Sequence, residues 1–238
     1  MNYSFYSATA AAQAQQRKFD VIANNLSNSN TTGFKTKYVT FTDLMYQNMN
    51  APETEETNLL RGAGAKMLKA DTDYAQGIIL PTDANFDYAI DGDGFFALFD
   101  PLTQQTSYTR NGHFVLSEQN NGDLYLVAEN GKWVLDKQGN RIVVDNFQDE
   151  VEIGVYIFDQ KNGMLNLGHG EFLPTPKNGQ PRLAENDDDL IQGFLECSNV
   201  EVEKEMIYLL ESQRAYQFAI KMIQTTDEIE GNINSLRQ

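Results

Sequence analysis

Cysteine and histidine are almost absent from this sequence of 238 residues. It contains one cysteine, Cys197, and two histidines, His113 and His169. A single cysteine excludes an intrachain disulfide, and no Cys/His cluster has the spacing of a zinc site. Neither histidine belongs to a Cys, Asp or Ser constellation typical of a catalytic base. We therefore expect no catalytic, cofactor-binding or metal-binding residues, and no enzyme.

Long apolar runs are also missing, because no stretch approaches the 18 apolar residues of a membrane span. The start, Met1 to Gln16, has no charged residue, but polar residues interrupt it. It therefore lacks the charged and apolar regions of a secretory signal. The sequence predicts a soluble protein that is exported, if at all, without a cleaved signal peptide.

Positive charge is scarce, and the formal net charge is −16. Residues 76–190 carry seven basic and nineteen acidic groups, whereas residues 1–75 carry seven of each. An acidic middle segment repels phosphate groups, so nucleic acid and anionic membrane surfaces are excluded as expected partners. The hydrophobic share of 41% is enough to form a core in one large domain or two small ones.

Two glycine-rich stretches resemble ligand loops only superficially. The segment from Asp91 to Gly94 reads Asp-Gly-Asp-Gly, but its flanks lack the acidic spacing of a calcium loop. Gly62 and Gly64 form a lone Gly-x-Gly that no Lys-Ser/Thr pair follows, so a phosphate loop is not expected. A hydrolase that uses Asp87, Asp91 and Asp93 has only their closeness in sequence to support it.

The strongest helical pattern is at the C-terminal end, from Ser198 to Leu236. Ser198 and Glu201 have the spacing of a capping box, which predicts that the helix begins there. Steps of four and three residues then follow a 3.5-residue seam, typical of a coiled coil. The seam residues are Val202, Met206, Leu209, Gln213, Tyr216, Ile220 and Ile223.

A matching seam lies at the N-terminal end. Its residues are Phe5, Ala8, Ala12, Gln15, Phe19, Ile22 and Leu26. Isolated helices of this length gain most of their stability from packing, so we expect the two terminal helices to pair. Alternatively, each stripe packs on a globular core. A central glutamine in each seam, Gln15 and Gln213, is interpreted as fixing the register of pairing. Alternatively, both glutamines lie at the edge of the packed face and contact water.

The middle of the chain changes to a two-residue period with regular turn signals. Pairs of Asn and Gly recur at 111–112, 121–122, 130–131 and 139–140, each suited to a tight hairpin turn. This pattern predicts short antiparallel strands, with Trp133 in their core. The expected strands are Phe95–Phe99, Phe114–Leu116, Leu124–Val127, Trp133–Leu135, Ile142–Val144 and Val151–Phe158.

Four segments together resemble the axial proteins of the bacterial flagellum, its rod and hook subunits. They are IANNLSNSNTTGFK at 22–35, FDYAIDGDGFF at 86–96, YTRNGHF at 108–114 and QGFLECSNV at 192–200, and they occur in the order of that family. Within the family, the chain is most similar to distal or proximal rod subunits. The residues that carry the resemblance are Asn24, Asn25, Asn30, Thr31, Gly33, Phe34, Gly92, Gly94, Phe95, Phe96, Ser198 and Asn199.

The resemblance implies an α+β fold, with paired N- and C-terminal helices of coiled-coil type and an inserted antiparallel β-rich domain. We expect an axial helix and signature at 1–35, a connector at 36–81 with a mobile part at 50–58, a β-rich domain at 82–185 and a return segment with helix at 186–238.

The family further implies a structural subunit of the flagellar rod in the basal body, which polymerises to transmit torque and to form the export channel. Its implied partners are rod subunits of the same and neighbouring types, hook and proximal rod proteins, and the type III export apparatus. The expected assembly interface consists of Phe5, Phe19, Ile22 and Leu26 with the seam residues at 202–223. The alternatives are an acidic β-rich binding module on a coiled-coil stalk, or another axial protein such as a hook subunit.

Overall fold

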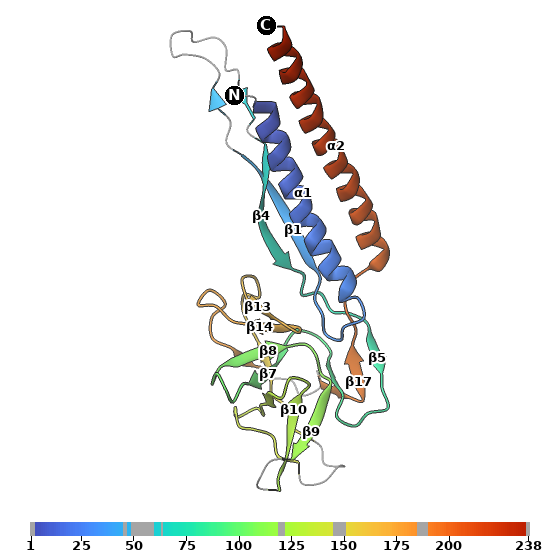
Figure 1. Cartoon of the computed structure of the whole chain (residues 1–238). Coiled ribbons are helices and arrows are strands. Elements are labelled where there is room, and N and C mark those ends of the chain that lie inside the picture. Colours follow the sequence, from blue (N-terminus) through green and yellow to red (C-terminus); the bar gives the residue numbers. More distant parts are fainter. Residues whose placement is uncertain are drawn as a thin grey trace. The chain divides into compact units, whose positions relative to one another are not determined.

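The computed structural model describes residues 3–44, 47–48, 60–62, 64–118, 122–144, 151–184 and 190–236 (Figure 1). Contacts divide the chain into two compact units. The first unit comprises residues 1–27, 37–71 and 201–238, and the second comprises 28–36 and 72–200. The predicted connector segment 50–58 lies outside the described residues.

The first unit is built on two long helices, α1 (Tyr3–Ser27) and α2 (Val202–Ser235), which pack against each other. They run antiparallel, so both chain ends lie at the same end of the pair (Figure 1). Strand β1 (Lys37–Asp43) contacts α1 and pairs with β4 (Ala65–Thr72). The short strands β2 (Gln47–Asn48) and β3 (Leu60–Arg61) form a second antiparallel pair.

Helix α2 begins later than the predicted capping box requires. Its N-cap is Glu201, in an extended conformation and without a side-chain capping bond. The Ser198 hydroxyl instead accepts a hydrogen bond from the N–H of Val200 at 3.3 Å, outside the helix. The capping-box prediction is therefore wrong, although Glu203 and Glu205 do place negative charge in the first turn.

The second unit contains an antiparallel nine-stranded sheet, with a main strand order of β13-β14-β8-β7-β11-β10-β9. Off this path, β12 pairs with β7 and with β15. The strands are β7 (Phe95–Phe99), β8 (Thr106–Thr109), β9 (Phe114–Glu118), β10 (Leu124–Ala128), β11 (Trp133–Val134), β12 (Val155–Ile157), β13 (Leu165–Gly168), β14 (Glu171–Leu173) and β15 (Arg182–Leu183). The expectation of an antiparallel β-rich region in an α+β chain is confirmed.

Two small pairs bring distant segments of the second unit together. Strand β5 (Ile79–Pro81) pairs with β17 (Phe194–Glu196), and β6 (Tyr88–Ile90) pairs with β16 (Leu190–Gln192). As a result, residues 72–81 and 190–200 group with the β-rich unit, and so do residues 28–36. The predicted domain boundaries at 35, 81 and 185 differ from this grouping, because strand pairing between segments far apart in the sequence determines which residues belong to the β-rich unit.

Alternation along β7 supplies both hydrophobic cores of this unit. Phe96 and Leu98 belong to one cluster, whereas Phe95 and Ala97 belong to the other. The sheet is thus apolar on both faces at β7, which explains the continuous run of phenylalanine and leucine.

The turn predictions are partly right. The Asn-Gly pair at 130–131 does link β10 to β11, and Gly131 has a φ of 79°. The pair at 111–112 makes no hairpin, because Gly112 instead lies against Tyr88, where a Cβ would be 1.7 Å from the Tyr88 carbonyl oxygen. The expected strand at 142–144 is also wrong, since only isolated bridges form at Arg141 and Val143.

Candidate functional site

Helix α2 turns an unexpected edge toward α1. Its buried residues are Glu205, Ser212, Ala219 and Thr226, spaced by seven. Of the predicted α2 seam residues, Leu209, Ile220 and Ile223 are half-buried, and the others, Val202, Met206, Gln213 and Tyr216, are exposed. The edge that packs within the chain is therefore narrower and more polar than the predicted seam.

Helix α1 contributes mainly alanine to the pair. Ala8, Ala12 and Ile22 of the predicted seam are buried, while Phe5 and Phe19 are each 39% exposed. Gln15 and Leu26 are half-buried. Small side chains allow two helices to approach closely, so most of the large apolar residues are not buried between the two helices.

The large apolar residues of the two helices instead face outward. Those exposed are Phe5, Tyr6, Phe19, Val202, Met206, Ile207, Tyr208, Leu210, Tyr216, Phe218, Met222, Ile229, Ile233 and Leu236. Met206 is 54% exposed and Phe218 is 70% exposed. An apolar surface of this extent marks an interaction site. We call it the helix exterior.

Asn25, a signature residue, holds the first unit together at one end. Its Nδ2 donates to the Glu205 Oε1 at 3.1 Å and to the Lys37 carbonyl at 2.7 Å, and its Oδ1 accepts from the Lys37 N–H at 3.0 Å. Burial raises the pKa of the Glu205 carboxyl, which the hydrogen bond from Asn25 and the charge of Lys18 oppose. One buried amide thus joins α1, β1 and α2.

A buried ionic cluster occupies the second unit, where three of the four resembling segments meet. The Glu196 carboxylate accepts from Lys35 Nζ at 2.6 Å, from Arg110 Nη1 at 3.0 Å and from the Gly77 N–H at 2.8 Å. The side chains of Lys35, Arg110 and Glu196 are at most 2% exposed. Burial lowers the pKa of Lys35, against the effect of the Glu196 charge. We call these three residues the ionic triad.

The ionic triad also explains neighbouring signature residues. The Gly92 carbonyl accepts a hydrogen bond from Arg110, and the Gly33 N–H donates to the Glu196 carbonyl at 2.8 Å. Gly33 has a φ of 66°, and a Cβ there would lie 2.4 Å from the Asn111 nitrogen. Glycine is therefore required at this close approach.

Asn199 makes a second junction close in sequence to the triad. Its Oδ1 accepts from the N–H and hydroxyl of Thr36, both at 2.7 Å, while its Nδ2 donates to the carbonyls of Asp73 and Ala75.

The other signature residues differ in burial. Phe34, Phe95, Phe96 and Gly94 are buried, whereas Asn24 and Asn30 are exposed. Thr31 donates to the Asn28 side chain at 3.3 Å.

Sequence reasoning assigned no buried contact to Lys35, Arg110 or Glu196, and gave Glu205 only a role as negative charge in the first turn of its helix. Charged residues are almost never fully buried unless they are paired, so a sequence pattern places them on the surface. For Lys35, Arg110 and Glu196, the available signal was their position inside three of the four resembling segments.

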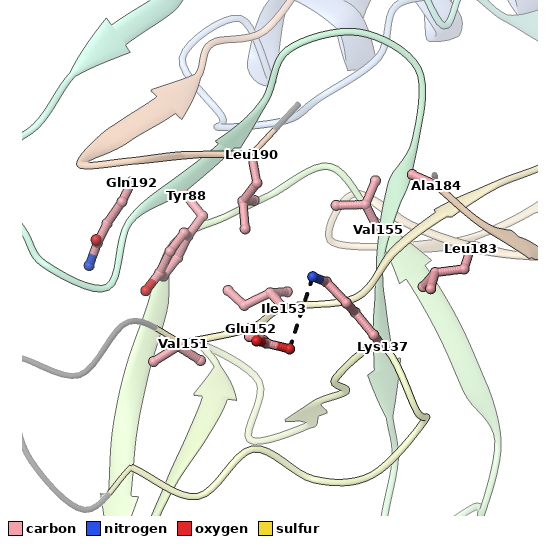
Figure 2. A pocket seen from close by; sticks show the side chains of 10 residues that line it. All are labelled: Tyr88, Lys137, Val151, Glu152, Ile153, Val155, Leu183, Ala184, Leu190 and Gln192. Carbon is pink, nitrogen blue, oxygen red and sulfur yellow. Dashed lines mark ion pairs between the residues drawn. The ribbon is translucent and has the colours of Figure 1, made fainter. Parts of the chain in front are cut away.

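The second unit also has a cavity of about 340 Å³ (Figure 2). Leu190, Ile153 and Val155 line it, and an ion pair of Lys137 with Glu152 at 4.0 Å lies across one side. The Tyr88 hydroxyl is buried with no hydrogen-bond partner in the described part of the chain, and burial raises its pKa. Among the described residues, no cysteine, serine or histidine lines this cavity.

Several other polar and aromatic groups of the second unit make local contacts. His113 Nδ1 lies 2.7 Å from Asp87 Oδ1, and Asp93 pairs with Lys161. Trp133, predicted in the core, is half-buried, stacked on Phe99 and covered by Arg141 at 4.0 Å.

Within the described ranges, no helix has the length and hydropathy to cross a membrane. The same residues contain no group of three or more His, Cys, Asp or Glu side chains that could hold a metal ion.

Family models match three parts of the chain. Residues 5–35 match "Flagella basal body rod protein", residues 89–156 match "Flagellar hook protein FlgE/F/G D1 domain", and residues 191–236 match "Flagellar basal body rod FlgEFG protein C-terminal". The matches include the helix pair and the residues of the ionic triad.

Relatives align over nearly the whole chain. The flagellar basal-body rod protein FlgG of Borreliella burgdorferi is 33% identical, over 100% of both chains. FlgG of Bacillus subtilis is 29% identical over 99% of both, and the rod protein FlgF of Mesorhizobium japonicum is 31% identical over 99% of this chain and 98% of its own.

Proposed function

Because this chain belongs to the flagellar basal-body rod protein family and is a structural subunit of the rod, we propose that it polymerises through the helix exterior. The observation that carries the proposal is the outward position of the large apolar residues on α1 and α2. In water this surface is unfavourable, because each large apolar side chain that remains exposed forgoes about 1.5–3 kcal/mol of burial free energy.

The distribution of apolar residues on α2 supports several neighbours rather than one. Val202 and Tyr216 lie on one side of the edge that faces α1, and Tyr208, Met222 and Ile229 lie on the other side. A two-stranded coiled coil needs one apolar stripe, whereas a helix that is apolar on several sides is buried on several sides. We infer packing between subunits in a tube, with the predicted seam as part of the contact.

The partners follow from the family. We propose that rod subunits of the same and neighbouring types, together with hook components, cover the helix exterior, and that the polymer transmits torque and encloses an export channel. We further propose that the subunit reaches the basal body through the flagellar type III export apparatus without a cleaved signal peptide. The absence of disulfide pairs, which would have to form after unfolded export, is compatible with this route.

The test is to place charge on the helix exterior. Replacing Met206 and Phe218, both on the helix exterior, together by Asp should abolish assembly, because two carboxylates would need to be desolvated without partners. A matched control replaces Leu165 and Leu167, which are 57% and 52% exposed on β13, by Asp. Sedimentation and electron microscopy measure assembly, and the fluorescence of Trp133, the single tryptophan, reports folding of the second unit.

We expect the control to assemble like the wild-type chain and both variants to keep the Trp133 spectrum. Assembly of the helix variant at the wild-type concentration would refute the proposal. Equal loss of assembly in the control would instead assign the effect to added charge and not to the helices.

A further inference from the structure

A small cavity of about 230 Å³ lies inside the first unit, between α1, β1 and α2. Lys18 and Ile22 of α1, Lys37 and Tyr38 of β1, and Glu205 and Tyr208 of α2 line it. Tyr38 is 50% exposed and Tyr208 is 44% exposed, so the cavity opens beside two tyrosine rings on the surface. All the residues that line it belong to one compact unit.

The two lysines of this cavity make no ion pair within the described residues. The charge of Lys18 acts on the Glu205 carboxyl from beyond ion-pair distance, and Lys18 Nζ lies 5.4 Å from the centre of the Tyr208 ring. Among the described residues of the lining, Glu205 is the only carboxylate. Its Oε1 accepts a hydrogen bond from Asn25, and its Oε2 is closed to solvent. Two lysine ammonium groups therefore belong to the lining, and the Glu205 carboxylate is not free to pair with both of them.

We propose that Lys18 and Lys37 form a carboxylate site that receives an acidic side chain from helix α2 of a second copy of this chain. The proposal rests on the polymerisation proposed above. The polymerisation proposal concerns the apolar area of the helix exterior, whereas this proposal concerns one polar contact between defined residues.

The charge of the chain supports this occupant. With a net charge of −16, a second copy is an acidic partner, and α2 itself carries six acidic and three basic residues. Its exposed acidic residues include Glu203, Glu211, Asp227 and Glu228. The α2 of a neighbouring copy must cover apolar surface in any case, so it can bring a carboxylate to the cavity in the same contact.

The physical effect of such a contact is specificity. Burial lowers the pKa of Lys37, so an anion that enters the cavity also relieves the cost of keeping that ammonium group charged. Charged groups arranged in complement across an interface select register and increase the association rate. Tyr38 and Tyr208 at the opening are of the residue type enriched at binding hot spots.

The first test compares assembly of the full chain with matched lysine variants. Lys18→Met/Lys37→Met keeps most of the aliphatic stems and removes both charges, and Lys66→Met/Lys221→Met removes two charges from exposed positions of the same unit. We expect the cavity variant to raise the critical concentration for assembly by tenfold or more at low salt. The control should change it by less than twofold.

Salt provides a second readout, because screening weakens contacts between charges. The critical concentration of the wild-type chain should rise with salt, and that of the cavity variant should not. Equal critical concentrations and equal salt dependence for the cavity and control variants would overturn the proposal, even if both assemble.

The second test identifies the occupant directly. Equal amounts of unlabelled and ¹⁵N-labelled full chain are assembled and treated with a carbodiimide, which joins a lysine amine and a carboxylate as an amide with loss of water. We expect mixed-isotope peptides that join Lys18 or Lys37 to an acidic residue of α2. Links from these lysines only to Glu205 of the same copy, or to acidic residues outside α2, would refute the site while leaving polymerisation intact. Failure of the wild-type chain to assemble at all would refute both.

Discussion

Removing the carboxylate of Glu196 should destabilise the second unit more than any other single change of charge in it. Glu196 accepts hydrogen bonds from Lys35, Arg110 and the Gly77 N–H at 2.6–3.0 Å. In Glu196→Gln, the amide NH₂ would face one of these donors, and two buried cations would lose their anion. Breaking a buried ion pair in this way costs about 3–5 kcal/mol.

This magnitude is large compared with the whole stability of a domain, which is about 5–15 kcal/mol. With a urea dependence of about 2 kcal/mol per molar, a loss of about 4 kcal/mol lowers the unfolding midpoint by about 2 M. Urea titration followed by Trp133 fluorescence measures it, because Trp133 belongs to the same unit as the ionic triad. The control is Glu152→Gln, whose partner Lys137 is 4.0 Å away and whose side chain is 73% exposed.

The control should change the unfolding free energy little, since exposed pairs contribute about 0–1 kcal/mol. A triple variant with Met at Lys35 and Arg110 and Leu at Glu196 should recover much of the loss, because apolar groups of similar volume can replace a buried ion cluster. If Glu196→Gln and Glu152→Gln unfold at the same urea concentration, the reasoning about the ionic triad is wrong.

Three further predictions address single contacts. Burial raises the pKa of Glu205 above its ordinary 4.5, so the folded chain holds this proton more tightly than the unfolded chain does. This group therefore contributes its full stability below about pH 4.5, and the contribution is lost as the pH rises through the folded-state pKa. Glu205→Gln should reduce this loss of stability with pH, measured as the melting temperature of the helix signal between pH 4 and 8. Gln15 Oε1 is buried without a partner in the described structure, so Gln15→Leu should stabilise the chain by about 1 kcal/mol, whereas Leu at the exposed Gln213 should not. Gly112→Ala places a Cβ 1.7 Å from the Tyr88 carbonyl oxygen and should cost at least about 2 kcal/mol in urea titrations; wild-type stability would contradict the close approach.

The elements that the sequence predicts well are those with local causes. Residue spacing alone indicates a helix near Phe5–Leu26, and α1 spans Tyr3–Ser27. The strand predicted at Phe95–Phe99 coincides with β7. In contrast, Ile142–Val144 has the composition of a strand but forms only bridges, because a strand exists through its partners and these are not local.

The face of α2 could not be predicted from hydrophobicity, because the helix has apolar residues on several sides. Ranking by side-chain size selects Met206 and Tyr216, yet the edge toward α1 has Ser212 and Ala219. Close packing against Ala8 and Ala12 of α1 favours small side chains at that edge. Hydrophobicity therefore cannot separate the face that packs against α1 from the helix exterior, which we propose contacts other subunits.

The two units differ in how complete their packing is, and this difference bears on assembly. The second unit has two hydrophobic clusters and an ionic triad in which Glu196 is fully paired. Each unit buries three side-chain polar atoms without partners among the described residues: Gln15 Oε1, Glu205 Oε2 and Ser212 Oγ in the first, and Thr82 Oγ1, Tyr88 Oη and Arg110 Nε in the second. The helix pair differs because it leaves its largest apolar side chains outside. We therefore expect the second unit to keep its structure in an isolated subunit, and the helices to gain most of their packing free energy when neighbouring subunits cover the helix exterior, as proposed above.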